Sequence, residues 1–128
     1  MGPKGRGRRA TVREGAGPVK RVEKPWGYEL WWAVTDRYAG KWIHVREGES
    51  LSLQYHRVKH ESMLVLSGVA EVQIEDRVER LEAGQAVEIP PRTRHRLTAV
   101  TDVDVIEVST PELDDVVRLE DRYGRVGS

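Results

Sequence analysis

The stretch GESLSLQYHRVKHE, residues 48–61, decides how the rest of the chain is interpreted. Alternate residues of a β-strand face the same side of its sheet, so Gln54 and His56 point together. Glu61 would return on the next strand and His95 on a later one. Singly, each residue is more often a hydrogen-bonded polar side chain or an exposed turn residue. Jointly, two imidazoles, a carboxylate and an amide oxygen inside a β-barrel predict a site for one divalent metal ion.

Short strands separated by turns continue on both sides of this stretch. Trp31 and Trp32 are neighbours in one of them, so one of the two must lie outside the core or in a subunit contact. The segment 112–119 fits a short helix or an extended segment equally well. The number and spacing of the strands predict an all-β fold, for which a jelly roll fits best. Strands are expected at residues 28–34, 41–45, 50–56, 62–66, 69–74, 78–81, 86–89, 95–100 and 103–109.

Composition limits the classes of protein to which the chain can belong. Its 128 residues suit one domain, with 38% hydrophobic and 33% charged residues. The absence of cysteine excludes disulfides and thiolate ligands. No apolar run approaches the length of a membrane span, and the N-terminus lacks the apolar core of a secretory signal. We therefore expect a cytoplasmic protein without a membrane partner.

The basic charge is concentrated at the N-terminus. Residues 1–21 carry seven Lys or Arg against one Glu, although the whole chain has a net charge of zero. Residues 1–20 are therefore predicted to be a flexible Arg/Gly-rich tail, followed by one domain at residues 21–126. Such a tail can bind polyanions. Because it has no aromatic residues and the remainder is acidic, we favour a solvated extension and expect no nucleic-acid partner.

A series of short motifs resembles one known family. The series comprises KPWGYE (24–29), LSLQ (51–54), IP (89–90), RHRL (94–97), IEV (106–108) and EDRYGR (120–125). In this order it resembles the cupin superfamily, and within it the C-terminal cupin domain of type II mannose-6-phosphate isomerases, over roughly residues 20–126. The resemblance implies a single cupin-type jelly-roll β-barrel in which Gln54 replaces the usual first histidine. In that family the domain usually follows a GDP-mannose pyrophosphorylase domain and carries the isomerase activity.

The resemblance implies an enzyme of polysaccharide and nucleotide-sugar biosynthesis that interconverts mannose 6-phosphate and fructose 6-phosphate, both small phosphorylated sugars. That reaction needs a base, a cation for the developing oxyanion and an anchor for phosphate. Zinc is the first expectation for the metal. Manganese, cobalt, nickel or iron could be bound instead, because the affinity of such a site discriminates poorly among divalent metals. By resemblance, Arg118 and Lys41 are the residues expected nearest the substrate, as catalytic residues. Further substrate-binding candidates are Lys24, Lys59 and Arg94.

Some features leave alternatives open. The family commonly has histidine and tryptophan where this chain has Val58, Ser62 and Met63. These departures favour, as an alternative, a non-catalytic metal-binding cupin that binds a sugar or sugar nucleotide as a regulatory module. Metal-dependent oxygenation is a weaker third possibility, since cupin dioxygenases usually rely on more histidines. The chain has no Gly-rich phosphate loop, so we expect no pyrophosphorylase activity.

Two further points of the interpretation concern the base and the oligomer. Spacing does not identify the general base, and Glu29 and His95 remain the candidates. His44 falls in a strand without a second motif to pair with, and His60 lies in the loop beside Glu61, so neither is assigned to the site. A small cupin with spare aromatic residues is expected to form a homodimer.

Overall fold

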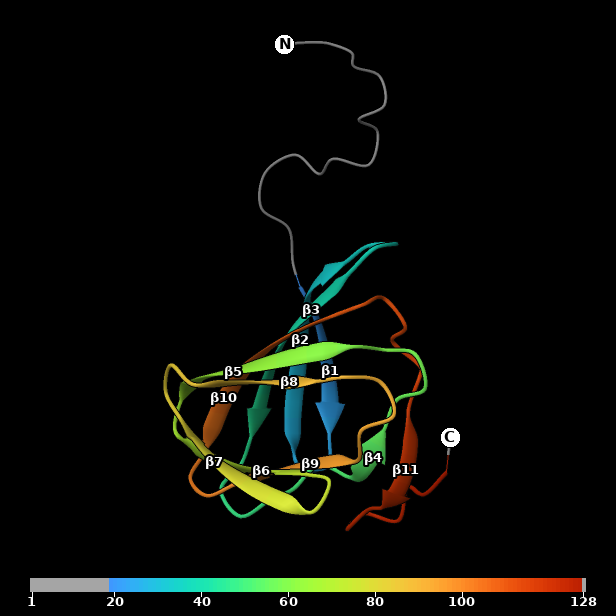
Figure 1. Ribbon diagram of the computed structural model, residues 1–128. Helices are drawn as coiled ribbons and strands as arrows, with labels where there is room; N and C mark the ends of the chain where they lie inside the picture. Colours follow the sequence, from blue (N-terminus) through green and yellow to red (C-terminus); the bar gives the residue numbers. More distant parts are fainter. Residues whose placement is uncertain (1–18, 128) are drawn as a thin grey trace.

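The computed structural model describes residues 19–127, which form eleven strands in two antiparallel sheets (Figure 1). The six-stranded sheet has the order β1 (Lys20–Lys24), β2 (Gly27–Val34), β3 (Ala39–Val45), β10 (Val103–Ser109), β5 (Glu61–Ser67) and β8 (Ala86–Ile89). The five-stranded sheet has the order β11 (Val117–Glu120), β4 (Leu53–Tyr55), β9 (His95–Ala99), β6 (Val69–Ile74) and β7 (Arg77–Glu82). The predicted all-β jelly roll is confirmed. Among residues 19–127, no helix is long and apolar enough to cross a membrane.

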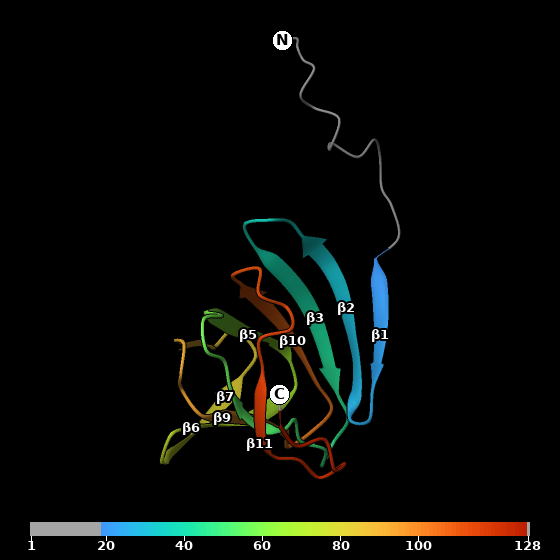
Figure 2. The same cartoon turned by 90° about the vertical axis from the view of Figure 1, so that its right-hand side faces the viewer.

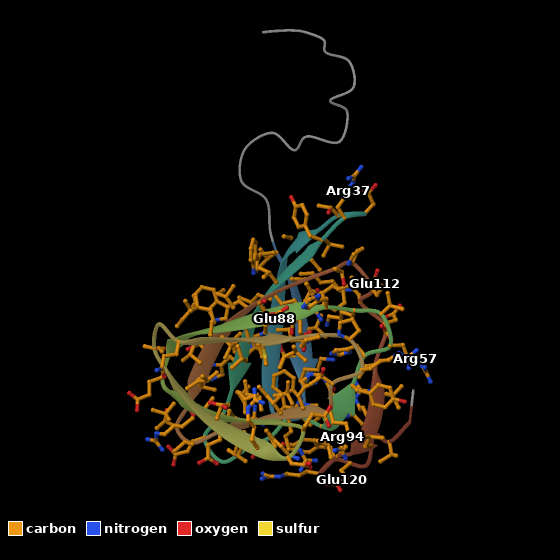
Figure 3. All side chains as sticks on the ribbon, viewed as in Figure 1. Arg37, Arg57, Glu88, Arg94, Glu112 and Glu120 are labelled. Atoms are coloured by element: carbon orange, nitrogen blue, oxygen red, sulfur yellow. The ribbon has the colours of Figure 1, made fainter. Side chains whose placement is uncertain are left out.

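The core lies between the two sheets, where side chains fill the interior of the barrel (Figure 3). The strands that build it, from β3 and from β5 to β10, direct alternate residues inward, as a period of two requires. On β10, for example, Val103 and Val105 are fully buried while Asp104 and Ile106 are only partly covered. The other fully buried aliphatic residues come from five further strands: Val45, Val65, Ala70, Val72, Ile89 and Ala99. This arrangement leaves one end of the barrel for polar side chains.

The N-terminal edge of the six-stranded sheet was not predicted. Residues 20–24 read KRVEK, too polar for a strand pattern, yet they pair with β2 from Lys20↔Trp31 to Lys24↔Gly27. The turn between the strands, at Pro25 and Trp26, places the Trp26 side chain in the core. Figure 2 shows β1 at the outer edge beside β2 and β3. The predicted tail at residues 1–20 lies, as far as residue 18, outside the described residues.

A bulge in β2 separates the two adjacent tryptophans. The register of β2 against β3 shifts between Trp31 and Ala33, so Trp32 has no partner on the neighbouring strand. Trp32 is 45% exposed and lies across Gly40, where a Cβ atom would stand 2.6 Å from its ring. The prediction that one tryptophan lies outside the core is confirmed for Trp32.

Two segments differ from the expected strand pattern. A strand was predicted at residues 50–56, but β4 covers only Leu53–Tyr55. The preceding residues instead follow β9 through single backbone hydrogen bonds, such as Leu51 N–H to the Leu97 carbonyl at 2.9 Å. The undecided segment at residues 112–119 is irregular at first and ends in β11, which pairs with β4. Both segments border the open end of the barrel.

Candidate metal centre

Three buried side chains converge inside the barrel. His56 follows β4 directly, Glu61 is the first residue of β5 and His95 is the first residue of β9. Oε2 of Glu61 lies 3.3 Å from Nε2 of His56 and 3.0 Å from Nε2 of His95. Each of the three residues is 3% exposed. One donor atom from each lies within 4.8 Å of the others, which is the spacing of ligands around a single ion.

The other ring nitrogen of each histidine is held by a carbonyl oxygen. Nδ1 of His56 lies 2.6 Å from the Asp115 carbonyl, and Nδ1 of His95 lies 2.8 Å from the Thr93 carbonyl. A carbonyl only accepts, so Nδ1 carries the hydrogen in both rings. In the neutral rings both Nε2 lone pairs therefore face the carboxylate of Glu61. Metal-binding histidines are commonly oriented in this way by hydrogen-bond partners outside the coordination sphere, here called outer partners.

The same arrangement leaves polar atoms without partners, which tests whether these residues fit a metal ion. Nε2 of His95 and Oε1 of Glu61 are buried without a hydrogen bond, although Oε1 lies 3.3 Å from the Lys59 ammonium. Buried lone pairs that face a carboxylate repel each other unless a proton or a cation lies between them. Two imidazoles and one carboxylate suit a divalent transition metal. The three side chains therefore fit the implied ion.

Gln54, the fourth predicted ligand, lies beside the three. It is the direct partner of His95 across β4 and β9. Gln54 also lines two cavities beside the cluster. Glu61 and His95 contribute to the wall of one, and His56 contributes to the wall of the other. Its Oε1 accepts a hydrogen bond from the Ser52 hydroxyl at 2.6 Å, which leaves one lone pair of that oxygen. Gln54 thus stands at the wall of the cluster with its amide oxygen oriented by Ser52.

Lys59 is buried next to this cluster between two carboxylates. Its Nζ lies 3.3 Å from Oε1 of Glu61 and 3.2 Å from Oε2 of Glu107. Burial disfavours the ammonium, but the charges of Glu107 and Glu61 raise the pKa of Lys59 above its ordinary value. Burial likewise works against ionisation of Glu61, yet His56, His95 and Lys59 hold the pKa of its carboxyl well below the usual range.

Glu107 is a functional candidate that the sequence interpretation missed. It is 6% exposed on β10 and lines both adjoining cavities. Burial, followed by the negative charge of Glu61, raises the pKa of Glu107 to about 7, against the opposing effect of Lys59. The alternation of Val103, Val105 and Glu107 on the inner face was a readable signal, because a carboxylate continues an otherwise apolar face.

A cavity with a basic lining, here called the basic cavity, opens beside the cluster. Its wall includes four predicted substrate residues, namely Lys24, Lys41, Lys59 and Arg118, together with Glu29, Gln54, His56, Glu107, Leu113 and Val116. Lys41 pairs with Glu29 at 3.3 Å, and Glu29 also accepts the indole N–H of Trp31 at 2.8 Å. Both contacts are made to Oε1 of Glu29.

Lys24 and Arg118 bring positive charge that is not neutralised locally. No carboxylate of residues 19–127 lies within 4.0 Å of either side chain's nitrogen atoms. Burial is the main cause that lowers the pKa of Lys24; Glu29 opposes it, while Lys41, Arg118 and Arg125 lower the pKa further. Burial and then Arg125 lower the pKa of Arg118 against the opposing charges of Asp121 and Glu29. Nε of Arg118 is buried without a hydrogen-bond partner. Such a cavity favours an anionic ligand.

The structure does not bring Arg94 to the basic cavity. Arg94 precedes β9 and is exposed, and its guanidinium pairs with Glu75 at 3.0 Å. The reason is the strand period: His95 faces the interior, so its neighbour faces away. The two histidines left outside the site also face outward, His44 against Asp104 at 2.9 Å and His60 against Glu88 at 2.6 Å.

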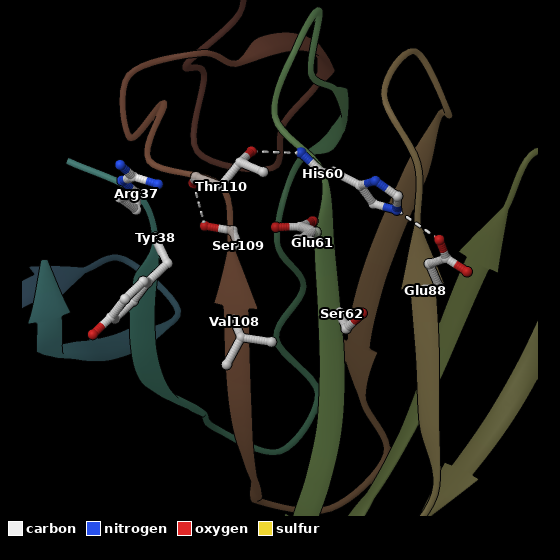
Figure 4. A pocket seen from close by; sticks show the side chains of 9 residues that line it. All are labelled: Arg37, Tyr38, His60, Glu61, Ser62, Glu88, Val108, Ser109 and Thr110. Atoms are coloured by element: carbon white, nitrogen blue, oxygen red, sulfur yellow. Dashed lines mark hydrogen bonds and ion pairs between the residues drawn. The ribbon is translucent and has the colours of Figure 1, made fainter. Parts of the chain in front are cut away.

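A second depression, here called the outer groove, lies on the outside of the six-stranded sheet (Figure 4). Figure 4 shows His60 turned toward Glu88, on the side of β5 opposite to Glu61. Its lining residues include Arg37, Tyr38, His60, Glu88 and Thr110. The groove is open, His60 in it pairs with Glu88, and the one residue that it shares with the buried cluster is Glu61.

Comparison with known proteins gives one family. A family model described as Mannose-6-phosphate isomerase C-terminal matches residues 13–121. Mannose-1-phosphate guanylyltransferase ManC of Salmonella typhimurium is 40% identical over 112 residues, which are 84% of this chain and 23% of that protein. Xanthan biosynthesis protein XanB of Xanthomonas campestris is 38% identical over 111 residues, covering 83% of this chain and 24% of the relative. The chain thus spans about a quarter of the length of these relatives.

Solved structures agree on the fold. An RmlC-like cupin from Shewanella frigidimarina has a TM-score of 0.67 at 16% identity, covering 73% of this chain and 84% of that structure. The fold is that of a cupin, as the sequence motifs predicted.

Proposed function

The chain belongs to the mannose-6-phosphate isomerase C-terminal family, and from this premise we propose that it is a metal-dependent isomerase that interconverts mannose 6-phosphate and fructose 6-phosphate. The observation that carries the proposal is one juxtaposition. The buried cluster of His56, Glu61 and His95 adjoins a cavity whose wall holds unneutralised basic side chains. One feature suits a divalent cation and the other suits a phosphate group.

His56, Glu61 and His95 would hold the metal, with Gln54 as a fourth ligand through its amide oxygen. Zinc is the first expectation, and manganese, cobalt, nickel or iron would also suit this donor set. Bound there, the cation would stabilise the negative charge that develops on the oxygens at C1 and C2 during isomerisation.

Lys24 and Arg118 are proposed to bind the phosphate. The planar fork of Arg118 can donate two hydrogen bonds to a phosphate, while Lys24 adds a point charge. Their lowered pKa values reflect burial near other cations, a penalty that an anion would relieve. Lys41 is ion-paired with Glu29 and lies in the wall of the same cavity, where it would donate a hydrogen bond to the sugar.

Glu107 is proposed as the group that moves the proton. Isomerisation removes the proton from C2 of mannose 6-phosphate while the oxygen at C1 gains one, which leaves an enediol. C1 then gains a proton and the hydroxyl at C2 loses its own, which leaves the ketone at C2. A carboxylate with a pKa of about 7 can accept and release that proton near neutral pH. Its position in the wall of both cavities supports this role.

The proposal is tested by a coupled assay on the purified chain, with mannose 6-phosphate supplied and fructose 6-phosphate measured, with and without a chelator. Turnover that disappears with chelation and in the His56→Ala variant supports the isomerase. A protein that binds one metal ion and mannose 6-phosphate without turnover contradicts it. That outcome would instead support the alternative, a non-catalytic cupin that binds a sugar or sugar nucleotide.

The assembly and location of the protein are separate proposals. The homodimer stays a prediction that a mass measurement in solution can test. The cytoplasmic location also stays a prediction. The role in polysaccharide biosynthesis is supported by relatives such as XanB, which is named as a xanthan biosynthesis protein.

A further inference from the structure

Asp115 makes an unusual set of contacts with the loop that follows the first metal-binding histidine. Its carboxylate accepts backbone hydrogen bonds from three consecutive residues: Arg57 at 3.0 Å, Val58 at 2.7 Å and Lys59 at 2.9 Å. One side chain thus holds the backbone N–H groups of three consecutive loop residues.

The main chain of the same residue contacts His56 itself. The carbonyl of Asp115 accepts the hydrogen of His56 Nδ1 at 2.6 Å. One residue thus fixes both the ring of His56 and the backbone of the three residues after it. Lys59, the last of these, is the residue that places its ammonium against Glu61.

Asp115 also lies within a segment that walls the basic cavity. Leu113 and Val116 are among the residues that line the cavity, and Arg118 follows two positions later at the start of β11. The segment before β11 is irregular, so its position depends on contacts such as those of Asp115 more than on a strand ladder. Any shift of the 57–59 loop would therefore move the cavity wall as well.

From these contacts we propose that Asp115 is a positioning residue that couples the metal centre to the wall of the substrate cavity. The inference rests on the proposed metal site. Metal bound to His56 would order the segment at residues 113–118, and the ordered segment would in turn strengthen metal binding, because such coupling is reciprocal. Outer partners of ligand histidines typically contribute about 10–100-fold in metal affinity.

The test compares Asp115→Ala and Asp115→Asn with Asp114→Ala, a change at the exposed neighbouring position. Calorimetry with Co²⁺ or Zn²⁺ alone gives the metal affinity of each apo protein, well below its unfolding temperature. Hydrogen exchange of residues 57–59 and 113–118, with and without metal, gives the coupling. Should Asp115→Ala fail to fold, Asp115→Asn keeps the size of the side chain while removing its charge.

The Asp115 variants keep the main-chain carbonyl that orients His56 but release the 57–59 loop. The proposal therefore expects metal binding weakened by about tenfold, the lower end of the range for outer partners, and wild-type affinity in Asp114→Ala. It also expects metal to slow exchange at residues 113–118 in the wild type but not in Asp115→Ala. A purely structural role would lower the unfolding temperature without either change. Equal metal affinity in wild type and Asp115→Ala overturns the inference alone. A wild type that binds no metal overturns the proposed metal site, and the inference with it.

Discussion

Nε2 of His95 lies 3.0 Å from Oε2 of Glu61, both inside the barrel, while Nδ1 of the same ring is committed to the Thr93 carbonyl. The contact brings two groups that each carry a lone pair face to face, and His56 repeats it from the other side at 3.3 Å. Only a positive centre makes this geometry favourable at neutral pH. The relationship leads directly to the first prediction.

His56→Ala and His95→Ala are each expected to weaken binding of a divalent metal by more than about 100-fold, since a lost ligand costs at least as much as a lost outer partner. The matched control is His60→Ala, because His60 faces outward and pairs with Glu88. Metal content after dialysis and the unfolding temperature with and without chelator measure the effect. Saturating metal at about 100 times its dissociation constant would stabilise the wild type by about 2.7 kcal/mol. Metal loss in His60→Ala would contradict the assignment.

The second prediction concerns the basic cavity. Arg118→Gln and Lys24→Gln are each expected to raise KM for mannose 6-phosphate about tenfold or more, because a lost phosphate contact costs about 1.4 kcal/mol or more. Arg94→Gln is the control, since Arg94 pairs with Glu75 away from the cavity. Steady-state kinetics on the three variants give the comparison. An Arg94→Gln defect equal to that of Arg118→Gln would refute the proposed phosphate site.

Much of the site could be predicted from the sequence because strand alternation is local. Gln54 and His56 share a face by their spacing, and Glu61 and His95 each begin a strand that returns to that face. Their convergence, however, depends on the single partnership Gln54↔His95 between strands far apart in the chain. One sequence does not specify that pairing from periodicity, and only the resemblance to cupins supplied it.

The remaining errors have the same physical origin. Arg94 was a substrate-binding candidate as one of several basic residues, but it directly precedes the inward-facing His95, and adjacent strand residues face opposite sides. Strand β1 was missed because its residues are mostly polar, and Lys24 on its inner side faces the basic cavity. Asp115 lay in a segment whose secondary structure could not be decided, since its contacts with the 57–59 loop span 56–58 residues of sequence.

The third prediction concerns the stability of the barrel and separates a steric clash from backbone strain. Gly68 lies between β5 and β6 with a φ of 84°, and a Cβ atom there would stand 2.0 Å from the Asp102 carbonyl oxygen. Gly84 has a similar φ of 88° but no atom within 4 Å of its Cβ position. Gly84→Ala should cost about 1–2 kcal/mol from strain alone, and Gly68→Ala about 3 kcal/mol or more. Urea denaturation measures the loss of unfolding free energy in each variant. Equal losses in the two variants would show that the loop at Asp102 moves aside freely.

The fourth prediction follows from the raised pKa of Glu107, about 7 against an ordinary 4.5. The fold disfavours the ionised form, so this residue's contribution to stability is complete below about pH 4.5 and is lost as the pH rises through 7. Over that window the loss is on the order of 3 kcal/mol. Glu107→Gln does not titrate, so its stability relative to the wild type should increase as the pH rises. Thermal unfolding between pH 5 and 8 measures this difference.

The same residue predicts a pH dependence of activity. As a base Glu107 must be ionised, so kcat/KM of the wild type should fall below about pH 7. Glu107→Gln should bind metal and sugar but lose exchange of the C2 proton of mannose 6-phosphate with solvent deuterium. A variant that retains this exchange would assign the proton transfer to another group.

The fifth prediction concerns Gln54, which stands where the general cupin motif usually has its first histidine. It directly opposes His95 and its amide oxygen is oriented by Ser52. An imidazole nitrogen binds zinc, cobalt or nickel more strongly than a neutral amide oxygen. Gln54→His should therefore tighten metal binding, by about tenfold for a gain of about 1.4 kcal/mol. Gln54→Leu, which offers no donor, should weaken it if the amide is a ligand. Calorimetry with Zn²⁺ on both variants measures the two changes, and an affinity that is the same in all three proteins would remove Gln54 from the ligand set.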